Sequence, residues 1–406
     1  MENNKSFIRM AVPIFLALFV SWFYCMVWTP LAYIYNTFPG QDNLVMLIAT
    51  IPGFVTMFGA LGASALINKI GMKNVVLIGM LTLLGGGLIV RFFGTSNIWI
   101  AIVGSALTGI AAGTGPTCCY TALAKFAPAN LRDKVIGWAD MATTGGMLVS
   151  GMLAGILARG GEWWKAFDLY WIVVPVIILT FFWFPEYKAE ETKEETASGK
   201  EEKAGIGTIP SFLLALIALR CVAAFFYMGR SLFSSAMIIN EYQLGDSALV
   251  GLSNSICTGV SVIVTGLVFA WLKVFKGNSI LASCLFMFAA QAVLAFVPSV
   301  ASVFIGPILM SFGLSTFTSG MSTAITMSAK GKITSIVSGL NIAAMFLGEA
   351  ICGYVSPFLA NIIFGTTAPS ACMKVCAFGC LIMGFVILPF FRKGYKEAFP
   401  ENAETK

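Results

Sequence analysis

The sequence predicts an all-α integral membrane protein in which twelve transmembrane helices form two pseudo-symmetric six-helix bundles. Composition is the first reason: 58% of the 406 residues are hydrophobic and 11% are charged, and the mean hydropathy is +0.87. Soluble domains are roughly 45–50% apolar and about 25% charged. The second reason is that apolar segments of about 20 residues, which a bilayer core about 30 Å thick requires, recur along the chain. The third is an internal repeat between the two halves.

The first apolar segment could be a cleaved signal peptide, since Lys5 and Arg9 precede it. It continues past Trp28 without an A-x-A cleavage pattern, so we interpret it as the first membrane helix. The remaining spans follow from apolar windows separated by short polar turns. The twelve predicted spans are 8–31, 42–67, 74–93, 97–123, 134–159, 167–184, 208–239, 246–272, 278–297, 299–328, 333–360 and 370–391.

A highly charged segment, PEYKAEETKEETASGKEEKAGIG, separates the sixth span from the seventh. It has no apolar face that could be buried, so we expect a solvated linker. This linker divides the chain into two halves of six spans each. The predicted domains are an N-terminal bundle over 1–184, the linker over 185–207, a C-terminal bundle over 208–392 and a tail over 393–406.

Basic residues predict the orientation in the membrane. With twelve spans both termini share one side, and placing them in the cytoplasm puts 19 of the 25 Lys and Arg residues on that side. Five fall outside and Arg220 lies within a helix, as the positive-inside rule requires. We therefore expect a multi-pass protein of the cell membrane with cytoplasmic termini. The net charge of +6 reflects this topology and not a nucleic-acid partner.

The halves repeat with an offset of about 202–204 residues. The spacing of three glycines in the fifth span recurs in the eleventh, and short motifs in other spans match at nearly the same offset. The matching pairs are Phe23 with Phe226 (FYCM and FYMG), Asp42 with Asp246, Gly109 with Gly313, and Gly137, Gly146 and Gly151 with Gly339, Gly348 and Gly353. Two parallel halves related by an axis along the membrane normal are one known transporter construction.

The loop between the second and third spans reads SALINKIGMK, Ser64 to Lys73. Its lysines could be only positive-inside charges in a tight turn, but their spacing resembles the motif G-x-L-x-D-[RK]-x-G-R-[KR] of the major facilitator superfamily. The matching positions are Leu66, Lys69, Gly71 and Lys73. Ser64 replaces the first glycine of that motif. The segment Ala127 to Gly137, APANLRDKVIG, is also similar to a loop of this superfamily.

The resemblance covers essentially the whole chain and implies a secondary transporter of major facilitator type that works by alternating access. It also implies a central cavity lined mainly by helices one, four, seven and ten, with five, eight and eleven contributing. In the family a loop aspartate helps hold one gate closed. Asn68 stands at that position here and can only hydrogen-bond, so we expect the gate to be held differently. The predicted gating residues are Asn68, Lys69, Gly71, Lys73, Arg132 and Asp140.

Three charged residues lie within predicted membrane helices, where ionisable side chains are costly and mark functional sites. Arg220, close to the midplane, can bind a carboxylate or phosphate bidentately and favours an anionic substrate. Glu349 is the candidate proton carrier, because burial favours the neutral form of a carboxylic acid and the chain has no histidine. The alternative is a structural ion pair between Arg220 and Glu349. Asp140 is expected to contact loop bases such as Arg132 or Lys69.

Aromatic and amide side chains in the same helices could line the substrate path, although helix packing alone explains many such aromatics. The candidate substrate-binding residues, besides Arg220, are Trp22, Tyr24, Tyr120, Tyr227, Asn254 and Asn341. The ten cysteines fall mostly inside apolar spans and have no metal-ligand spacing. We therefore expect neither a metal nor another cofactor.

No catalytic motif suggests an enzyme, and no P-loop suggests an ATP-driven pump. We predict proton-coupled uptake of a small organic solute, such as a carboxylate or other anionic metabolite, across the cytoplasmic membrane by a functional monomer. The alternative is proton-antiport efflux of drugs or lipophilic compounds. The fifth span, WADMATTGGMLVSGMLAG, lacks the glycine-proline motif that family exporters often carry, which favours uptake. The expected partners are the substrate, a coupling proton and the lipid bilayer.

Overall fold

The computed structural model describes residues 2–128, 131–187, 209–329 and 333–398. Within these ranges the chain forms helices and no strand, and twelve helical segments are long and apolar enough to cross a membrane. All twelve overlap the predicted spans, which confirms the all-α membrane fold. Most of the predicted linker and residues 399–406 of the tail lie outside the described residues.

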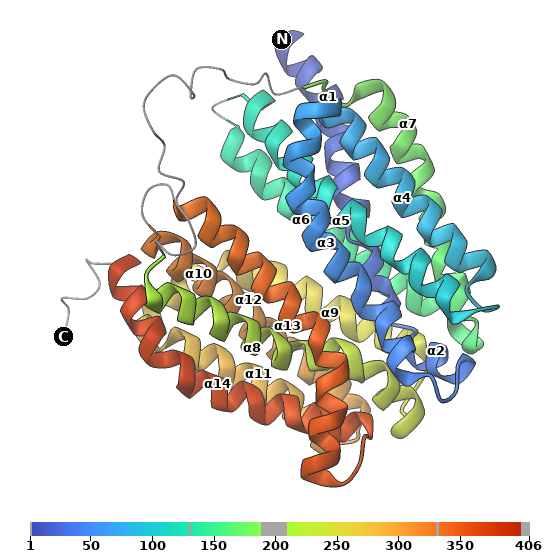
Figure 1. Cartoon of the computed structure of the whole chain (residues 1–406), viewed down its shortest axis with the longest axis vertical. Coiled ribbons are helices and arrows are strands. Elements are labelled where there is room, and N and C mark those ends of the chain that lie inside the picture. Colours follow the sequence, from blue (N-terminus) through green and yellow to red (C-terminus); the bar gives the residue numbers. More distant parts are fainter. Residues whose placement is uncertain (1, 129–130, 188–208, 330–332, 399–406) are drawn as a thin grey trace. The chain divides into compact units, whose positions relative to one another are not determined.

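Contacts divide the chain into two compact units, Met1–Lys200 with Asp246–Ser255 and Glu201–Gly245 with Ile256–Lys406 (Figure 1). The helices before the linker are α1 (Glu2–Ser21), α2 (Leu31–Thr37), α3 (Asp42–Ile70), α4 (Met72–Phe93), α5 (Ile98–Phe126), α6 (Arg132–Leu157) and α7 (Val173–Trp183). Those after it are α8 (Ser211–Ala236), α9 (Ser247–Gly266), α10 (Val268–Phe275), α11 (Ser279–Phe296), α12 (Val300–Ser328), α13 (Ile333–Phe364) and α14 (Pro369–Ala398).

Glycines allow the helices of each unit to approach closely. A Cβ atom added to Gly104 on α5 would lie 2.8 Å from the carbonyl oxygen of Gly86 on α4. In the second unit, a Cβ atom on Gly306 of α12 would lie 3.1 Å from the carbonyl oxygen of Ala290 on α11. Because only a hydrogen fits comfortably at such sites, the helix backbones can pack against each other directly.

A second pair of glycines repeats between the units. A Cβ atom on Gly146 of α6 would overlap the carbonyl oxygen of Phe19 on α1, and one on Gly348 of α13 would overlap that of Cys221 on α8. Both members of this contact are displaced by 202 residues between the units. The structure therefore confirms the pseudo-symmetry that the sequence repeat predicts.

The first predicted span is not one continuous α-helix. α1 ends at Ser21, a 3₁₀ segment runs from Phe23 to Trp28, and α2 begins after Pro30. Proline has no backbone N–H to continue the hydrogen-bond ladder, so Pro30 separates the 3₁₀ segment from α2. The sixth span likewise opens with a 3₁₀ segment, Trp163–Ile172, before α7.

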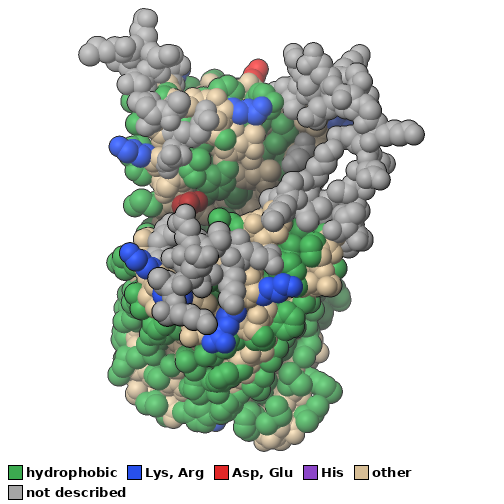
Figure 2. Space-filling view, turned by 90° about the vertical axis from the view of Figure 1, so that its left-hand side faces the viewer, with side chains coloured by type: hydrophobic (Ala, Val, Ile, Leu, Met, Phe, Trp, Pro, Cys, Tyr) green, Lys and Arg blue, Asp and Glu red, His purple; other side chains and the backbone are tan. Residues whose placement is uncertain are grey.

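Large apolar side chains are exposed on the surface. Phe182 is 70% exposed and Ile263 is 66% exposed. Figure 2 shows hydrophobic side chains over much of one face, with Lys and Arg side chains scattered among them. In water such a surface would favour aggregation, whereas lipid chains solvate it without cost.

Candidate functional site

Arg220 is the central feature of the second unit. Its side chain is on α8 and only 2% of the residue is exposed. Nη1 donates a long hydrogen bond of 3.5 Å to the carbonyl oxygen of Thr318, and Nη2 lies 3.3 Å from the sulfur of Met345. Nε has no hydrogen-bond partner among the described residues. A thioether is a weak acceptor, so the guanidinium is poorly compensated.

An aromatic ring joins Arg220 to a second polar group. The Cζ atom of Arg220 lies 5.5 Å from the ring centroid of Phe317, within the range of a cation–π interaction. The same ring meets the ring of Tyr227 edge-on, with centroids 6.3 Å apart. Tyr227 is seven residues after Arg220 on α8, and two helical turns bring both side chains to one face.

Tyr227 donates a hydrogen bond of 2.8 Å from its hydroxyl to Oε1 of Glu349 on α13. Within the described part of the chain, Arg220 and Glu349 form no ion pair with each other. The carboxyl group therefore has a tyrosine as its hydrogen-bond partner, and the arginine has no carboxylate.

Asn341 lies one turn before Met345 on α13. Its Nδ2 atom donates to the hydroxyl of Ser322 on α12 at 3.2 Å, and its Oδ1 atom is buried without a hydrogen-bond partner. Asn341 itself is 5% exposed. Arg220 and Asn341 are thus two of the buried polar side chains of the second unit that are incompletely hydrogen-bonded among the described residues.

The first unit contains the aromatic residues of the 3₁₀ segment. The ring of Tyr24 lies 5.7 Å from that of Trp22 and 6.3 Å from that of Trp28, and Ala112 of α5 joins this cluster. These distances are typical of packed aromatic side chains. Asn254 donates to the hydroxyl of Thr29, at the end of the same segment, over 3.3 Å.

Tyr120 and Asp140 contact each other. The tyrosine, on α5, donates a hydrogen bond from its hydroxyl to Oδ1 of Asp140 on α6, and Asp140 is exposed. Lys69 and Asp140 form no ion pair in the part of the chain that the structure describes. The structure does not describe the side chain of Arg132, so a contact between Asp140 and Arg132 stays a prediction.

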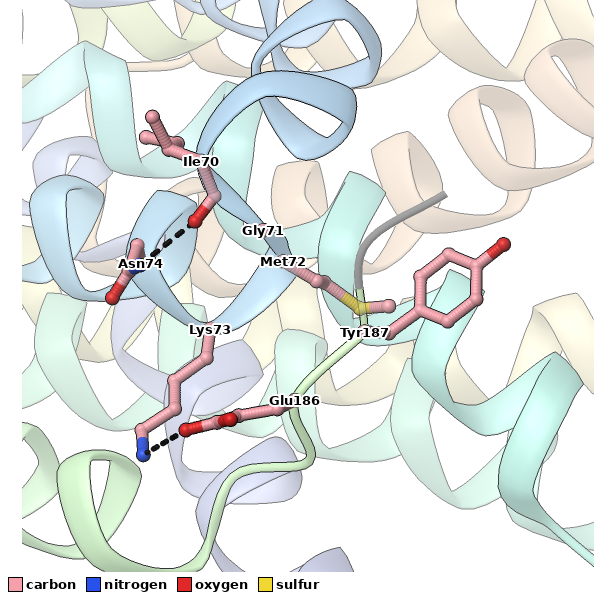
Figure 3. A pocket seen from close by; sticks show the side chains of 7 residues that line it. All are labelled: Ile70, Gly71, Met72, Lys73, Asn74, Glu186 and Tyr187. Atoms are coloured by element: carbon pink, nitrogen blue, oxygen red, sulfur yellow. Dashed lines mark hydrogen bonds and ion pairs between the residues drawn. The ribbon is translucent and has the colours of Figure 1, made fainter. Parts of the chain in front are cut away.

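The loop between α3 and α4 is held by two residues that follow α7 (Figure 3). Gly71 has φ +83°, a conformation that glycine adopts without strain. The N–H of Met72 donates to the carbonyl oxygen of Tyr187 over 2.7 Å. Nζ of Lys73 lies 3.2 Å from Oε1 of Glu186. The loop is therefore tied to the end of the sixth span by backbone and charge together.

These residues surround a pocket of about 300 Å³, shown in Figure 3. Its lining residues are Ile70, Gly71, Met72, Lys73, Asn74, Glu186 and Tyr187. Lys125, near the end of α5, adds a further contact, because its Nζ atom donates to the hydroxyl of Tyr187 and lies 3.8 Å from the centroid of that ring. Asn68 and Lys69 are exposed on the last turn of α3.

The family model of the Major Facilitator Superfamily matches residues 12–272, which is more than half of the chain. The chain belongs to the major facilitator superfamily. It is therefore a transporter and not an enzyme, and a multi-pass membrane protein. No curated protein matches the sequence.

Several solved structures share the major facilitator fold with this chain. A peptide transporter of the POT family in complex with sulfate has a TM-score of 0.74 and 12% identity, with 95% of each chain covered. A nucleoside transporter has a TM-score of 0.74 and 10% identity, with 94% of this chain and 99% of that chain covered. The xylose transporter XylE from E. coli, in an inward-open conformation, has a TM-score of 0.71 and 12% identity, with 95% and 96% covered. At these identities the likeness concerns the fold alone.

Within this superfamily chain, the structure brings the predicted residues together in separate groups. Arg220, Tyr227, Glu349 and Asn341 share one region of the second unit, whereas Tyr120 pairs with Asp140 in the first. Residues that the sequence analysis missed complete these groups. They are Phe317, Thr318, Ser322 and Met345 in the second unit and Lys125, Glu186 and Tyr187 in the first.

Proposed function

We propose that the protein takes up a small organic anion, such as a carboxylate, by proton-coupled alternating access. The observation that carries this proposal is the buried Arg220, whose charge has no carboxylate partner and whose Nε donor has no acceptor among the residues that the structure describes. The protein's membership of the major facilitator superfamily indicates that it is a secondary transporter. The solved neighbours that carry peptides, nucleosides and xylose are consistent with a small-molecule substrate.

An uncompensated buried cation is costly, since the effective penalty for removing an ion from water is several kcal/mol. The cation–π contact with Phe317 and the long hydrogen bond to Thr318 offset only part of this penalty. A bound carboxylate would accept from the planar guanidinium through two parallel hydrogen bonds. Substrate binding would then supply the partner that the described residues do not provide.

Glu349 is our candidate for the coupling proton. It lies within a membrane span, and its hydrogen-bond donor is a tyrosine hydroxyl and not a basic side chain. Since the chain has no histidine, a carboxyl group is the natural carrier. Because Glu349 forms no ion pair with Arg220 among the described residues, the arginine does not need to release this carboxylate before it binds a substrate.

We also propose that the loop around Gly71 and Lys73, together with Asp140, takes part in gating. In this proposal the two six-helix bundles cover 1–184 and 208–392, and the monomer resides in the cell membrane with both termini and the 185–207 linker in the cytoplasm. Single cysteines placed at Asn43 and in the linker of a cysteine-free protein should then react with impermeant reagents from opposite sides. Reaction from the same side would contradict this topology.

Ligand binding by the purified protein tests the proposed substrate class. We expect organic anions to raise its melting temperature, and Arg220→Lys to weaken that binding about 10- to 100-fold, because a point charge cannot replace the planar fork. Arg91→Lys is the matched control, since Arg91 already pairs with Asp168 at 2.5 Å, and it should leave anion binding unchanged. Stabilisation by lipophilic cations alone would refute the proposal and favour the efflux alternative.

A further inference from the structure

Polar residues of α12 and α13 face each other in pairs, and successive pairs are one helical turn apart. We call each such pair, with the side chains that contact it, a level. Asn341, Met345 and Glu349 are spaced by four residues on α13, so they share one face of the helix. On α12, Ser322 contacts Asn341, and the Thr318 carbonyl, one turn away, shares the Arg220 guanidinium with Met345. The two helices therefore run antiparallel in register, and each step of one turn moves from one polar pair to the next.

Arg220 occupies the middle level, between two levels of different chemistry. On one side are Tyr227 and Glu349, which hydrogen-bond each other. On the other side is Asn341, whose Nδ2 atom is bound by Ser322 and whose Oδ1 atom has no partner. One helical turn, about 5.4 Å, separates adjacent levels. The unsatisfied groups of this region are thus a cationic donor and, one turn away, a neutral acceptor.

Both unsatisfied groups are buried, Arg220 at 2% and Asn341 at 5% exposure. Burying a polar atom without a hydrogen bond is unfavourable, so both are expected to be satisfied when the site is filled. A neutral amide oxygen accepts a hydrogen bond from a hydroxyl or amino group, and it repels a second carboxylate. The pair therefore selects for a ligand with an anionic end and a hydrogen-bond donor at its other end.

We infer that the substrate is a short carboxylate carrying a hydroxyl or amino group, with the carboxylate on Arg220 and the donor on Oδ1 of Asn341. This inference rests on the proposed function and specifies its substrate class. A chain of about four carbons places the donor roughly one helical turn from the carboxylate. A simple fatty acid of this length leaves Asn341 unsatisfied, and a dicarboxylate places a negative charge against its oxygen.

Four ligands of equal chain length test the inference on the purified full-length protein. Calorimetry or competition binding should show 4-hydroxybutyrate and 4-aminobutyrate binding at least about tenfold more tightly than butyrate and succinate. Asn341→Leu should remove this preference while leaving butyrate affinity within about threefold of the original. Asn361→Leu makes the same substitution at an exposed position of α13 and should preserve the preference.

The outcomes separate this inference from the proposed function. Equal affinity for all four ligands, or tightest binding of succinate, would overturn the donor requirement while Arg220-dependent binding still supported anion transport. A preference for the hydroxyl or amino ligand that survives in Asn341→Leu would also overturn the assignment. Failure of all four ligands to bind would overturn the inference, and the Arg220→Lys test would then judge anion transport separately.

Discussion

The two units share a helical scaffold and differ in the chemistry placed on it. Gly146 and Gly348 receive the carbonyl groups of Phe19 and Cys221 in the same way, 202 residues apart. At this offset, Leu18 and Met147 of the first unit stand where the second unit has Arg220 and Glu349. Both halves therefore share this close packing, whereas only the second has ionisable side chains at these positions.

The first unit carries its polar contacts near helix ends. Tyr120 meets Asp140 near the ends of α5 and α6 that adjoin in sequence, and Lys73 meets Glu186 at the start of α4. In the second unit, the polar contacts of Arg220, Glu349 and Asn341 lie within α8, α12 and α13. This difference is the basis of our proposal that the second unit binds the substrate and the coupling proton, whereas the first unit supplies the gating contacts.

The largest effect should come from breaking the shared scaffold. Gly146→Ala and Gly348→Ala each place a methyl group on a carbonyl of the neighbouring helix, and overpacking of this kind typically costs about 1–3 kcal/mol. We expect both variants to lose folded protein, measured by size-exclusion chromatography and melting temperature.

Two other glycines of the same helices serve as controls. Gly137 and Gly339 have open space around an added Cβ atom, so their alanine variants should be as stable as the original protein or more so. Equal melting temperatures for all four variants would mean that the repeated glycine contacts do not determine helix packing.

The next largest effect should distinguish Glu349 in the second unit from Asp140 in the first. Glu349→Gln should abolish accumulation driven by a pH gradient while preserving substrate exchange, since the amide oxygen still accepts a hydrogen bond from Tyr227 but the amide neither binds nor releases a proton. Asp140→Asn keeps its hydrogen bond from Tyr120 in the same way and should change accumulation by less than about threefold. Proteoliposomes with and without an imposed pH gradient provide both measurements.

Two results would contradict this division between the units. Loss of accumulation in both single variants would place proton chemistry in each unit. Recovery of transport in the Arg220→Gln, Glu349→Gln double variant would show that the two residues act as a structural pair.

Sequence reasoning predicted the spans well because a bilayer requires long apolar runs, and those runs are visible residue by residue. It proposed Arg220, Glu349 and Asn341 as site residues for the related reason that polar side chains are rare in such runs. It missed Thr318 and Met345, because a backbone carbonyl and a thioether carry no distinctive sequence signal. It also predicted one continuous first span, where Pro30 and the 3₁₀ segment before it interrupt the helix.

The loop of the first unit shows a similar limit. The motif identified Gly71 and Lys73, but their partners Glu186 and Tyr187 lie more than 110 residues away at the start of the charged linker. An excess of acidic residues there was the available signal, and only the folded structure shows which of them the loop contacts.

A moderate effect is expected from the backbone of this loop. Gly71→Val forces a β-branched residue into a left-handed conformation at φ +83°, which costs of order 1–3 kcal/mol locally. We expect transport to fall severalfold while the protein still inserts and purifies, because the strain is confined to the turn. Gly62→Val, on α3 with open space around its Cβ position, is the control. Full transport activity in Gly71→Val would mean that the loop serves only as a spacer.

The smallest effect should come from the ion pair that holds the same loop. Glu186 is 83% exposed and Lys73 19% exposed in their side chains, and pairs open to water contribute at most about 1 kcal/mol. Lys73→Ala and Glu186→Ala should therefore lower the melting temperature only slightly. The double variant should lower the melting temperature by less than the sum of the two single effects, because the first substitution has already broken the ion pair. The backbone hydrogen bond from Met72 to Tyr187 remains in every variant, so the loop should keep its position.

Two outcomes would contradict this prediction. Strict additivity of the melting-temperature changes would show that the two charges do not interact. A large loss of transport in either single variant would assign the gate to the ion pair and not to the glycine turn.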